Sequence, residues 1–328
     1  MKKYIFKEQF NFPLNCLQSI GINMCKTNEE YFKIIAEQQP LDFLSKHICP
    51  YLVGSQWNTI RRCALLMGVT SDCPTLRMRL HLLLCGGPGT GKTEFLKWWQ
   101  RKMGGVLINS ELTSKTGLVG DARGKKIHPG LLAQSHGNVL LIDELDKMSA
   151  EDQNGLLQTM EEGSYTITKG KNHETFKAEV RIIATCNDLT KVQKPIIDRF
   201  DFPFQVQQVS RDQRADYVSN IIDSFMGKNS KDYSLVVKAY LDWARKAITQ
   251  IDPTDEAVIK KTIKEYILKA DDAIGGFSYR NLEFSILRIA YAYALLERKS
   301  ILEQHIQFAI GLKDQILHDF SKGPHTII

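Results

Sequence analysis

The stretch Leu80–Thr93 constrains this chain more than any other part of the sequence. It begins with a short apolar run, Leu80–Cys85, which predicts a buried strand, and it continues into the letters GGPGTGKT. A helix-like pattern, EFLKWWQRK, follows directly. Strand, glycine-rich loop and helix in this order are the context that a phosphate-binding loop requires. The sequence therefore predicts an anion site at the start of a helix, where free backbone N–H groups gather.

Each residue type in this loop suits the binding of a nucleoside triphosphate. Glycines let the backbone curl so that its N–H groups point into one cavity, and the Lys92 ammonium is expected to reach the β- and γ-phosphates. The Thr93 hydroxyl is expected to hold Mg²⁺. A plain glycine-rich linker is the alternative, and the full GxxxxGKT spacing disfavours it. We therefore predict that ATP and Mg²⁺ bind through Gly86, Gly87, Pro88, Gly89, Thr90, Gly91, Lys92 and Thr93.

The composition is that of a globular protein with enough apolar residues for a proper core. The 328 residues are 43% hydrophobic and 24% charged, and this length suits a nucleotide-binding domain with a smaller companion. The net charge of +6 permits contact with nucleic acid, but solubility explains it equally well. The seven cysteines include no CxxC pair, so a zinc finger is not expected. Reduced thiols, and no apolar run of membrane-spanning length, favour a soluble intracellular protein without a membrane partner.

Apolar strands alternate with helical patterns over roughly 75–206, and this alternation predicts a parallel sheet with helices around it. From Arg211 onward the pattern is helical to the end of the chain. Further strands are expected at Gly105–Ile108, Val139–Ile142, Val180–Thr185 and Phe202–Val206. Helices are expected at Asn28–Gln38, Asp212–Phe225, Leu235–Ile248, Glu256–Ala270 and Tyr279–Arg298.

Polar side chains end two of these strands. Asp143 and Glu144 follow one apolar strand and Asn187 follows the next. Ligands of doubly wound sheets bind outside the carboxyl ends of the strands, so Asp143 is expected to hold Mg²⁺ and Glu144 to polarise an attacking water. Asn187 is expected to orient that water. The alternatives are a solvated acidic strand end for the carboxylates and a simple turn residue for Asn187.

Two arginines have two interpretations each. Arg199 lies in the sequence DRFD before the last strand, where it would either contact γ-phosphate oxygens or pair internally with Asp198 or Asp201. Arg280 opens a helix, where a cation opposes the helix dipole. It is either a phosphate-sensing side chain or an ordinary surface arginine.

Basic side chains gather in two exposed segments. Residues 164–177 predict a β-hairpin that carries Lys169, Lys171 and His173 near its tip. An earlier polar loop carries Arg123, Lys125 and Lys126. These side chains either grip a phosphate backbone or keep exposed loops soluble, and charge alone leaves both possibilities open.

Motifs spread over roughly 28–315 resemble the AAA+ ATPase core of the MCM replicative helicases. The lead-in PYLVGSQWNTIRRCALLMGV and the loop GGPGTGKT are similar to the family's first motifs. The block around IDELDKM resembles Walker B, RIIATCND resembles sensor 1, and IIDRFDFPFQV resembles the arginine-finger segment. The helix YRNLEFSILRIAYAYA resembles the lid with its sensor 2 arginine.

The resemblance implies an α/β fold of the AAA+ P-loop NTPase type, with a parallel RecA-like sheet flanked by helices and followed by an α-helical lid. It implies an N-terminal extension at 1–44, a nucleotide-binding core at 45–209 and a lid at 210–328. Within the core, 113–130 resembles the helix-2 insert and 164–177 the pre-sensor 1 hairpin.

The resemblance also implies roles for the residues named above. Lys92, Thr93, Asp143, Glu144 and Asn187 would bind and hydrolyse ATP within one subunit. Arg199 and Arg280 would act on a neighbour's nucleotide, and a site shared between subunits requires a ring, expected to be a homo-hexamer. The basic residues of the hairpin and the insert would then grip single-stranded or forked DNA.

Three departures from the family pattern limit what the resemblance implies. The loop reads GGPGTGKT where MCM proteins usually carry GDP and end in KS, and the helix-2 insert is short. Only residues 1–44 precede the core, so the family's N-terminal OB-fold and zinc-bearing domain is not expected here, nor is a C-terminal winged helix. The chain is expected to act either alone or with a partner protein that supplies the missing N-terminal function. The expected activity is that of an ATP hydrolase of the DNA helicase type; the alternatives are a MoxR- or chelatase-type protein remodeller and an ATP-switched replication initiator or helicase loader.

Overall fold

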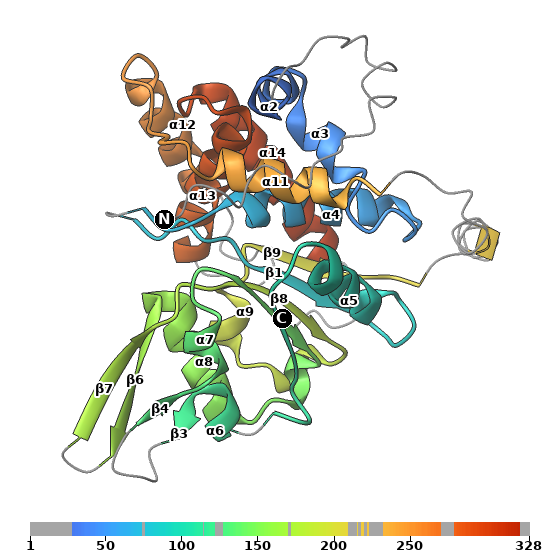
Figure 1. Cartoon of the computed structure of the whole chain (residues 1–328). Coiled ribbons are helices and arrows are strands. Elements are labelled where there is room, and N and C mark those ends of the chain that lie inside the picture. The colour runs from blue at the N-terminus through green and yellow to red at the C-terminus, as the bar shows by residue number, and fades with distance from the viewer. Residues whose placement is uncertain are drawn as a thin grey trace, which may run out of the picture.

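A five-stranded parallel sheet forms the centre of the molecule, with the strand order β2-β5-β8-β1-β9 (Figure 1). The computed structural model describes residues 28–73, 76–113, 115–121, 127–169, 172–208, 232–269 and 279–321, with four single positions between 215 and 222. The strands are β1 (Leu82–Cys85), β2 (Val106–Asn109), β5 (Val139–Asp143), β8 (Arg181–Cys186) and β9 (Phe202–Gln205). The predicted parallel α/β sheet is therefore confirmed.

The strands are readable in the sequence because both faces of the sheet are covered. In β1, Leu82 and Leu84 belong to one buried cluster, while Leu83 and Cys85 belong to the other. This alternation follows from the period of two in a strand, whose successive side chains point to opposite faces. A strand buried on both faces needs a continuous apolar run, which is the pattern that β1, β5 and β8 display.

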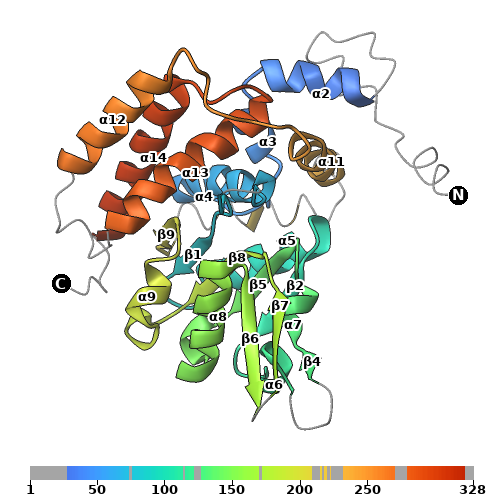
Figure 2. The same ribbon diagram turned by 90° about the vertical axis from the view of Figure 1, so that its left-hand side faces the viewer.

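A layer of helices covers one face of the sheet (Figure 2). It contains helices from both ends of the described chain: α4 packs on α13 and on α11, and α14 packs on β9. The segment that precedes the phosphate loop and the C-terminal segment thus fold into one apolar cluster. The helices are α2 (Asn28–Glu37), α3 (Pro40–Ser45), α4 (Ser55–Val69), α5 (Lys92–Lys102), α11 (Ser234–Ala244), α12 (Glu256–Lys269), α13 (Tyr279–Glu297) and α14 (Glu303–Ser321).

The other face carries α7 (Leu131–Gln134), α8 (Ala150–Glu162) and α9 (Lys194–Ile197), with the short 3-10 turns η1 (Leu145–Lys147) and η2 (Leu189–Lys191). The predicted hairpin is confirmed as β6 (Ser164–Lys169) paired with β7 (Asn172–Lys177). Beside it lie α6 (Lys115–Leu118) and the two-residue strands β3 (Gly120–Asp121) and β4 (His128–Pro129). Figures 1 and 2 show the hairpin extending away from the helical layer.

Some element boundaries differ from the prediction. β1 begins at Leu82 rather than Leu80, because the Leu80 amide donates to Thr70 Oγ1 at 3.3 Å instead of to a neighbouring strand. The helix expected at Leu235–Ile248 ends at Ala244, and the Ile248 side chain is 97% exposed. The helix expected at Asp212–Phe225 lies outside the described residues, apart from the single positions mentioned above. Within the described residues, no helix has the length and apolar character needed to cross a membrane.

A buried arginine ties the segment before α4 to that helix. The Arg61 side chain is only 7% exposed. Its Nε donates to Ile48 O at 2.8 Å, and its Nη2 donates to Cys49 O at 3.0 Å and to Leu52 O. Burial lowers the pKa of the guanidinium, and the carbonyl oxygens compensate for the water that it has lost. This arginine therefore shapes the loop that leads towards the phosphate-binding region.

Replacement of Arg61 with alanine is expected to lower the free energy of unfolding by about 3 kcal/mol, because several buried carbonyl oxygens lose their donor. The neighbouring Arg62, whose partner Asp42 is half exposed, provides a matched control. Arg62→Ala is expected to cost about 1 kcal/mol or less. Urea unfolding followed by circular dichroism measures both values, and equal losses in the two variants would contradict this account of Arg61.

Candidate functional site

The phosphate loop connects the end of β1 to the start of α5, and its shape requires glycine at two places. Gly86 has φ +151°, and a Cβ there would lie 2.3 Å from Val206 O. Gly91 has φ +94°, and a Cβ there would lie 3.0 Å from Leu52 Cδ2 and 3.2 Å from Trp57 Cζ2. A side chain at either position would force the surrounding backbone or core apart. The loop is therefore pressed against β9 on one side and against the lead-in of α4 on the other.

The Lys92 side chain is folded into the loop and is only 6% exposed. Its Nζ donates to Gly86 O at 2.6 Å, to Gly87 O at 2.8 Å and to Thr90 Oγ1 at 3.2 Å. Burial lowers the pKa of this ammonium, and the nearby carboxylates, including Asp143, oppose that shift. The loop thus keeps a cation at its own centre, where an anionic ligand would meet it.

The Asp143 carboxylate lies within hydrogen-bond distance of the loop helix. Thr93 Oγ1 donates to Asp143 Oδ1 at 3.1 Å, and Thr185 Oγ1 donates to the same oxygen at 2.7 Å. The Thr185 hydroxyl also accepts from the Glu144 amide at 3.0 Å. The ends of β5 and β8 and the start of α5 are therefore linked by one set of hydrogen bonds, which orients Asp143 and the backbone of Glu144 together.

Thr185 and Asp146 were missed by the sequence reasoning, and each orients a predicted residue. Thr185 is 1% exposed and is the one polar residue within the apolar run IIATC of β8, a signal that could have identified it. Asp146 is 6% exposed, and its Oδ1 accepts from the Asn187 amide at 3.2 Å. Asn187 thereby lies beside the acidic strand end, as expected from the sheet geometry.

Glu144 adopts a backbone conformation that is uncommon for its residue type. It has φ 60° and ψ 54°, in the left-handed region. Such a conformation costs a residue with a side chain on the order of 1 kcal/mol, and it persists only where the surroundings hold it. Here the hydrogen bond to Thr185 holds the Glu144 amide, and the Lys147 amide donates to Glu144 O at 2.9 Å. The turn directs the chain from β5 into η1 immediately after Asp143.

Arg199 lies at the edge of the sheet formed by the amino ends of the strands, opposite the edge formed by their carboxyl ends, where the phosphate loop begins. Phe202 in β9 pairs with Leu82, the first residue of β1, whereas the phosphate loop follows Cys85 at the other end. The four residues of β1 separate the amino-end edge from the carboxyl-end edge, a distance of about 13 Å. The Arg199 guanidinium donates to Glu161 Oε1, so the partner is neither of the two aspartates suggested by the sequence.

The remaining predicted residues are described only in part. Arg280 lies in the first turn of α13, but its side chain lies outside the described residues. The backbone of Lys169 ends β6, and the His173 side chain is exposed on β7. Lys171, Arg123, Lys125 and Lys126 lie outside the described residues.

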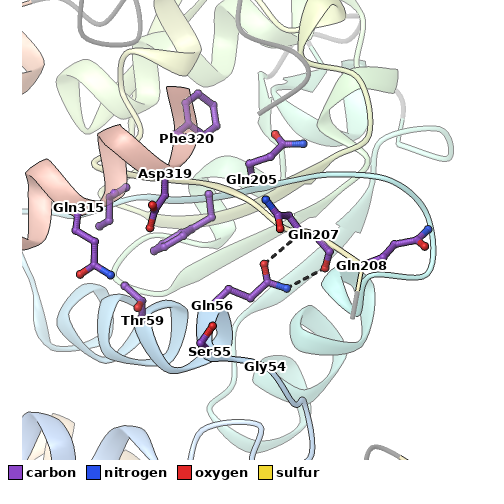
Figure 3. Close-up of a pocket in the computed structure, with 12 residues that line it drawn as sticks. Gly54, Ser55, Gln56, Thr59, Gln205, Gln207, Gln208, Gln315, Asp319 and Phe320 are labelled. Atoms are coloured by element: carbon purple, nitrogen blue, oxygen red, sulfur yellow. Dashed lines mark hydrogen bonds between the residues drawn. The ribbon is translucent and has the colours of Figure 1, made fainter. Parts of the chain in front are cut away.

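A polar cavity of about 420 Å³ lies between α4, the end of β9 and α14 (Figure 3). Its walls come from the first turn of α4, the end of β9 and the last turns of α14. Gln56 Nε2 donates to Gln207 O at 2.9 Å, and the Gln207 amide donates to Gln56 Oε1 at 3.0 Å. These two hydrogen bonds hold the start of α4 against Gln207. The residue before it, Val206, contacts Gly86 of the phosphate loop. Side-chain amides such as Gln56 and Gln315 offer both donors and acceptors to a ligand.

If the chain hydrolyses ATP as its sequence predicts, replacement of Thr185 with valine is expected to lower that rate by about tenfold, the equivalent of one hydrogen bond lost in the transition state. Valine has nearly the same shape, but it cannot donate to Asp143 or accept from the Glu144 amide. Thr185→Ser keeps the hydroxyl and is the matched control. Steady-state kinetics measures both variants, and hydrolysis by Thr185→Val at the unaltered rate would rule out this role.

The chain matches the family model described as the MCM P-loop domain over residues 27–225. It is 27% identical to DNA replication licensing factor MCM3 of Entamoeba histolytica, in a match covering 64% of this chain and 37% of that protein. The Minichromosome maintenance protein MCM of Saccharolobus solfataricus is 25% identical, with 79% of this chain and 42% of that protein covered. An uncharacterized MCM-type protein of Methanocaldococcus jannaschii is 27% identical, with 94% of this chain and 46% of that protein covered.

The chain spans less than half the length of each of these three relatives. The family model nevertheless covers more than half of the chain, and it includes the phosphate loop, Asp143 and Glu144 at the end of β5, Asn187 and Arg199. The chain therefore belongs to the MCM family.

Proposed function

We propose that this chain is an ATP-hydrolysing motor that works as a ring and translocates on or unwinds DNA. The observation that carries the proposal is the joining of Thr93, Asp143 and Thr185 through one carboxylate oxygen, next to the buried ammonium of Lys92. A cation, a hydroxyl and a carboxylate at a helix N-terminus form an arrangement suited to a triphosphate with its metal ion.

The residues of the site have separable roles in this proposal. The loop amides and Lys92 bind the β- and γ-phosphates, while Thr93 and Asp143 hold Mg²⁺, which would neutralise charge between those phosphates. Glu144 accepts a hydrogen bond from the attacking water and polarises it, and Asn187 orients the same water. Within the described residues, no group of three or more His, Cys, Asp and Glu side chains is arranged for a metal. This fits Mg²⁺, which is commonly held by one or two carboxylates together with phosphate oxygens and water.

The polar cavity between α4, β9 and α14 is suited to the base of the nucleotide. Gln205 and Gln207 line it, and Val206 between them lies against Gly86 of the loop. The amides of Gln56 and Gln315 can match the donors and acceptors on the edge of a purine. We propose that the adenine of ATP occupies this cavity while its phosphates bind in the loop.

The position of Arg199 supports a ring. Its guanidinium lies at the edge of the sheet opposite the phosphate loop, so it is too distant to complete the site of its own chain. A repeated head-to-tail contact would bring this edge to a neighbour's nucleotide, and such contacts form a ring where the rotation between neighbours closes. We propose that Arg199 and Arg280 act on the neighbour's ATP in a homo-hexamer. DNA would run through the ring against the hairpin β6–β7 and the insert.

Replacement of Lys92 with alanine is expected to abolish ATP binding, because the cation at the centre of the loop is lost. Glu144→Gln is expected to bind ATP with nearly unchanged affinity but to lose turnover, since the amide cannot polarise the water. Equilibrium binding of a fluorescent ATP analogue, together with phosphate release, separates the two effects. Turnover by Glu144→Gln at the normal rate would reject its catalytic role.

Single-stranded DNA is expected to increase ATP hydrolysis by the unaltered chain. Joint replacement of Lys169 and Lys171 with alanine is expected to reduce both DNA affinity and this stimulation, because phosphate contacts are lost. An assay of fork unwinding tests for helicase activity, and a measurement of molecular mass in the presence of ATP tests for the ring. An ATPase rate indifferent to DNA, with unchanged DNA affinity in the double variant, would favour a protein remodeller. ATP-dependent assembly with little turnover would instead favour an initiator or loader.

Mixtures of Arg199→Ala and Glu144→Gln subunits are expected to regain part of the ATP hydrolysis that each variant lacks alone. Some interfaces in a mixed ring then combine an intact Glu144 with an intact Arg199 from the neighbour. Phosphate release is measured over a range of mixing ratios, and native mass spectrometry verifies that mixed rings form. Mixed rings without any recovered activity would contradict a shared site.

A further inference from the structure

Helix α8 connects the two edges of the sheet. It begins after η1, close to Glu144 and Asp146, where Ser149 caps it by accepting from the Asp152 amide at 3.2 Å. It has 13 residues, so it is about 20 Å long and runs back across the depth of the sheet. It ends at Gly163, whose carbonyl accepts from the Ala178 amide at 2.7 Å at the base of the hairpin. The helix therefore joins the candidate ATP site to the root of β6 and β7.

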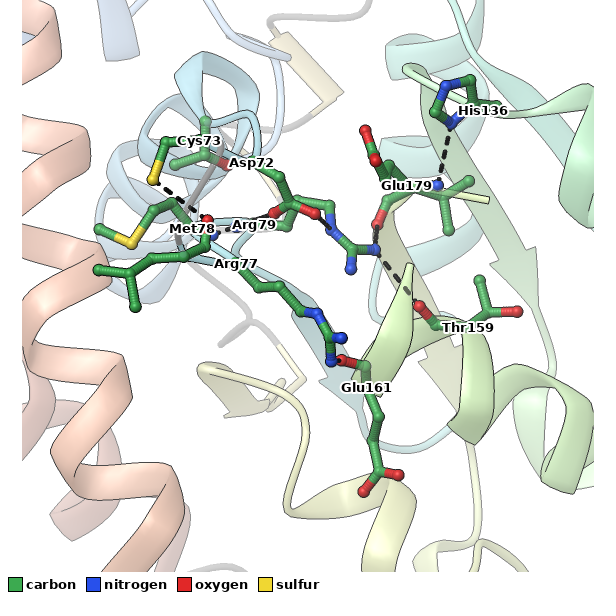
Figure 4. Close-up of polar contacts among 12 residues, drawn as sticks. Asp72, Cys73, Arg77, Met78, Arg79, His136, Thr159, Glu161 and Glu179 are labelled. Carbon is green, nitrogen blue, oxygen red and sulfur yellow. Dashed lines mark hydrogen bonds and ion pairs between the residues drawn. The ribbon is translucent and has the colours of Figure 1, made fainter. Parts of the chain in front are cut away.

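Three arginines converge on the last turns of α8. Arg79 Nη1 donates to Thr159 O at 3.4 Å, and Arg77 Nη1 donates to Glu161 O (Figure 4). Arg199 Nη2 donates to the side-chain oxygen Glu161 Oε1. Cations at the C-terminus of a helix interact favourably with its dipole, so this end of α8 is a natural place for guanidinium groups. Glu161 is the one residue of the turn that binds two of them, through its carbonyl and its carboxylate.

Helix α13 reaches the same place. Arg288 Nε donates to Arg77 O at 3.0 Å, and Arg288 Nη1 lies 3.3 Å from Asp201 Oδ1. Arg77, Arg199 and Arg288 line one cavity of about 310 Å³ together with Glu161. The Arg199–Glu161 pair is partly buried, with 20% and 31% of the two side chains exposed. Water screens such a pair less than a fully exposed one, so the carboxylate restrains Arg199 effectively.

We propose that Glu161 is a positioning residue that ties Arg199 to the base of the hairpin and so couples DNA engagement to ATP hydrolysis. Displacement of the hairpin moves the last turn of α8, and the Glu161 carboxylate carries the Arg199 guanidinium with it. Phosphate oxygens of a neighbour's ATP compete for the same guanidinium, because a carboxylate and a phosphate accept the arginine fork in the same way. This inference rests on the proposed function, since the roles of Arg199 and of the hairpin belong to it.

The test compares Glu161→Gln with Glu162→Gln in the full chain. Glu162 is the adjacent exposed residue, and its carboxylate accepts a long hydrogen bond from Gln158 Nε2 at 3.4 Å, so its variant controls for the loss of one charge nearby. ATP hydrolysis is measured with and without single-stranded DNA. Glu161→Gln is expected to lose most of the DNA stimulation, about fivefold or more, while its KM for ATP and its DNA affinity stay within about twofold. Glu162→Gln is expected to match the unaltered chain.

A double variant distinguishes positioning from a merely structural effect. If Glu161 acts through Arg199, then Glu161→Gln adds little to the loss of stimulation already caused by Arg199→Lys, which keeps the charge without the fork. Glu161→Asp keeps the charge but shortens its reach, and it is expected to lose part of the stimulation even if Glu161→Gln folds poorly. Unchanged stimulation in Glu161→Gln, or independent losses in the double variant, would overturn the inference. Absence of DNA stimulation in the unaltered chain would instead overturn the proposed function, and the inference with it.

Discussion

Parallel hydrogen bonding between three central strands is the constraint on which the candidate site depends. The register pairs Leu84 with Thr185 and Ile142 with Ala184, so Asp143 comes level with Thr185 at the strand ends. A slip of one residue would turn Thr185 or Asp143 to the opposite face. The two apolar cores oppose such a slip, because each strand contributes alternate residues to a different core. Packing on both faces of the sheet thus sets the positions of the polar atoms at its edge.

Buried cations recur in this molecule, and they share one mode of stabilisation. Lys313 is 0% exposed, its Nζ donates to Asp201 O at 2.7 Å, and burial lowers its pKa to about 8. Arg181 donates to Gly68 O at 2.6 Å and to Gly137 O at 2.9 Å, and burial lowers its pKa to about 9. Lys92 lies on carbonyl oxygens in the same way. Backbone carbonyls replace the lost water in each case, and the cation in return fixes a loop or a helix end.

The fold places the candidate ATP site and Arg199 at opposite edges of the sheet, and one helix connects them. One edge of the sheet carries the phosphate loop and the acidic strand end, while the other carries Arg199 and the root of the hairpin. Helix α8 spans the distance between these edges. The proposed ring motor needs such a connection, because events at one subunit's nucleotide must reach the part that contacts the next subunit. The membership of this chain in the MCM family gives that arrangement its functional context.

The sequence by itself determined the order of the elements and the chemistry of the phosphate loop. Continuous apolar runs revealed the buried strands, and the hairpin at 164–177 was evident from its alternation and turn residues. The contacts of Thr185, Asp146 and Glu161 were decided only by the tertiary structure, as was the packing of α4 among the C-terminal helices. These side chains meet partners that are distant in the sequence, as Glu161 and Arg199 do. Local patterns report which face a residue buries, but long-range pairing depends on strand order and on the path of helices between the sheet edges.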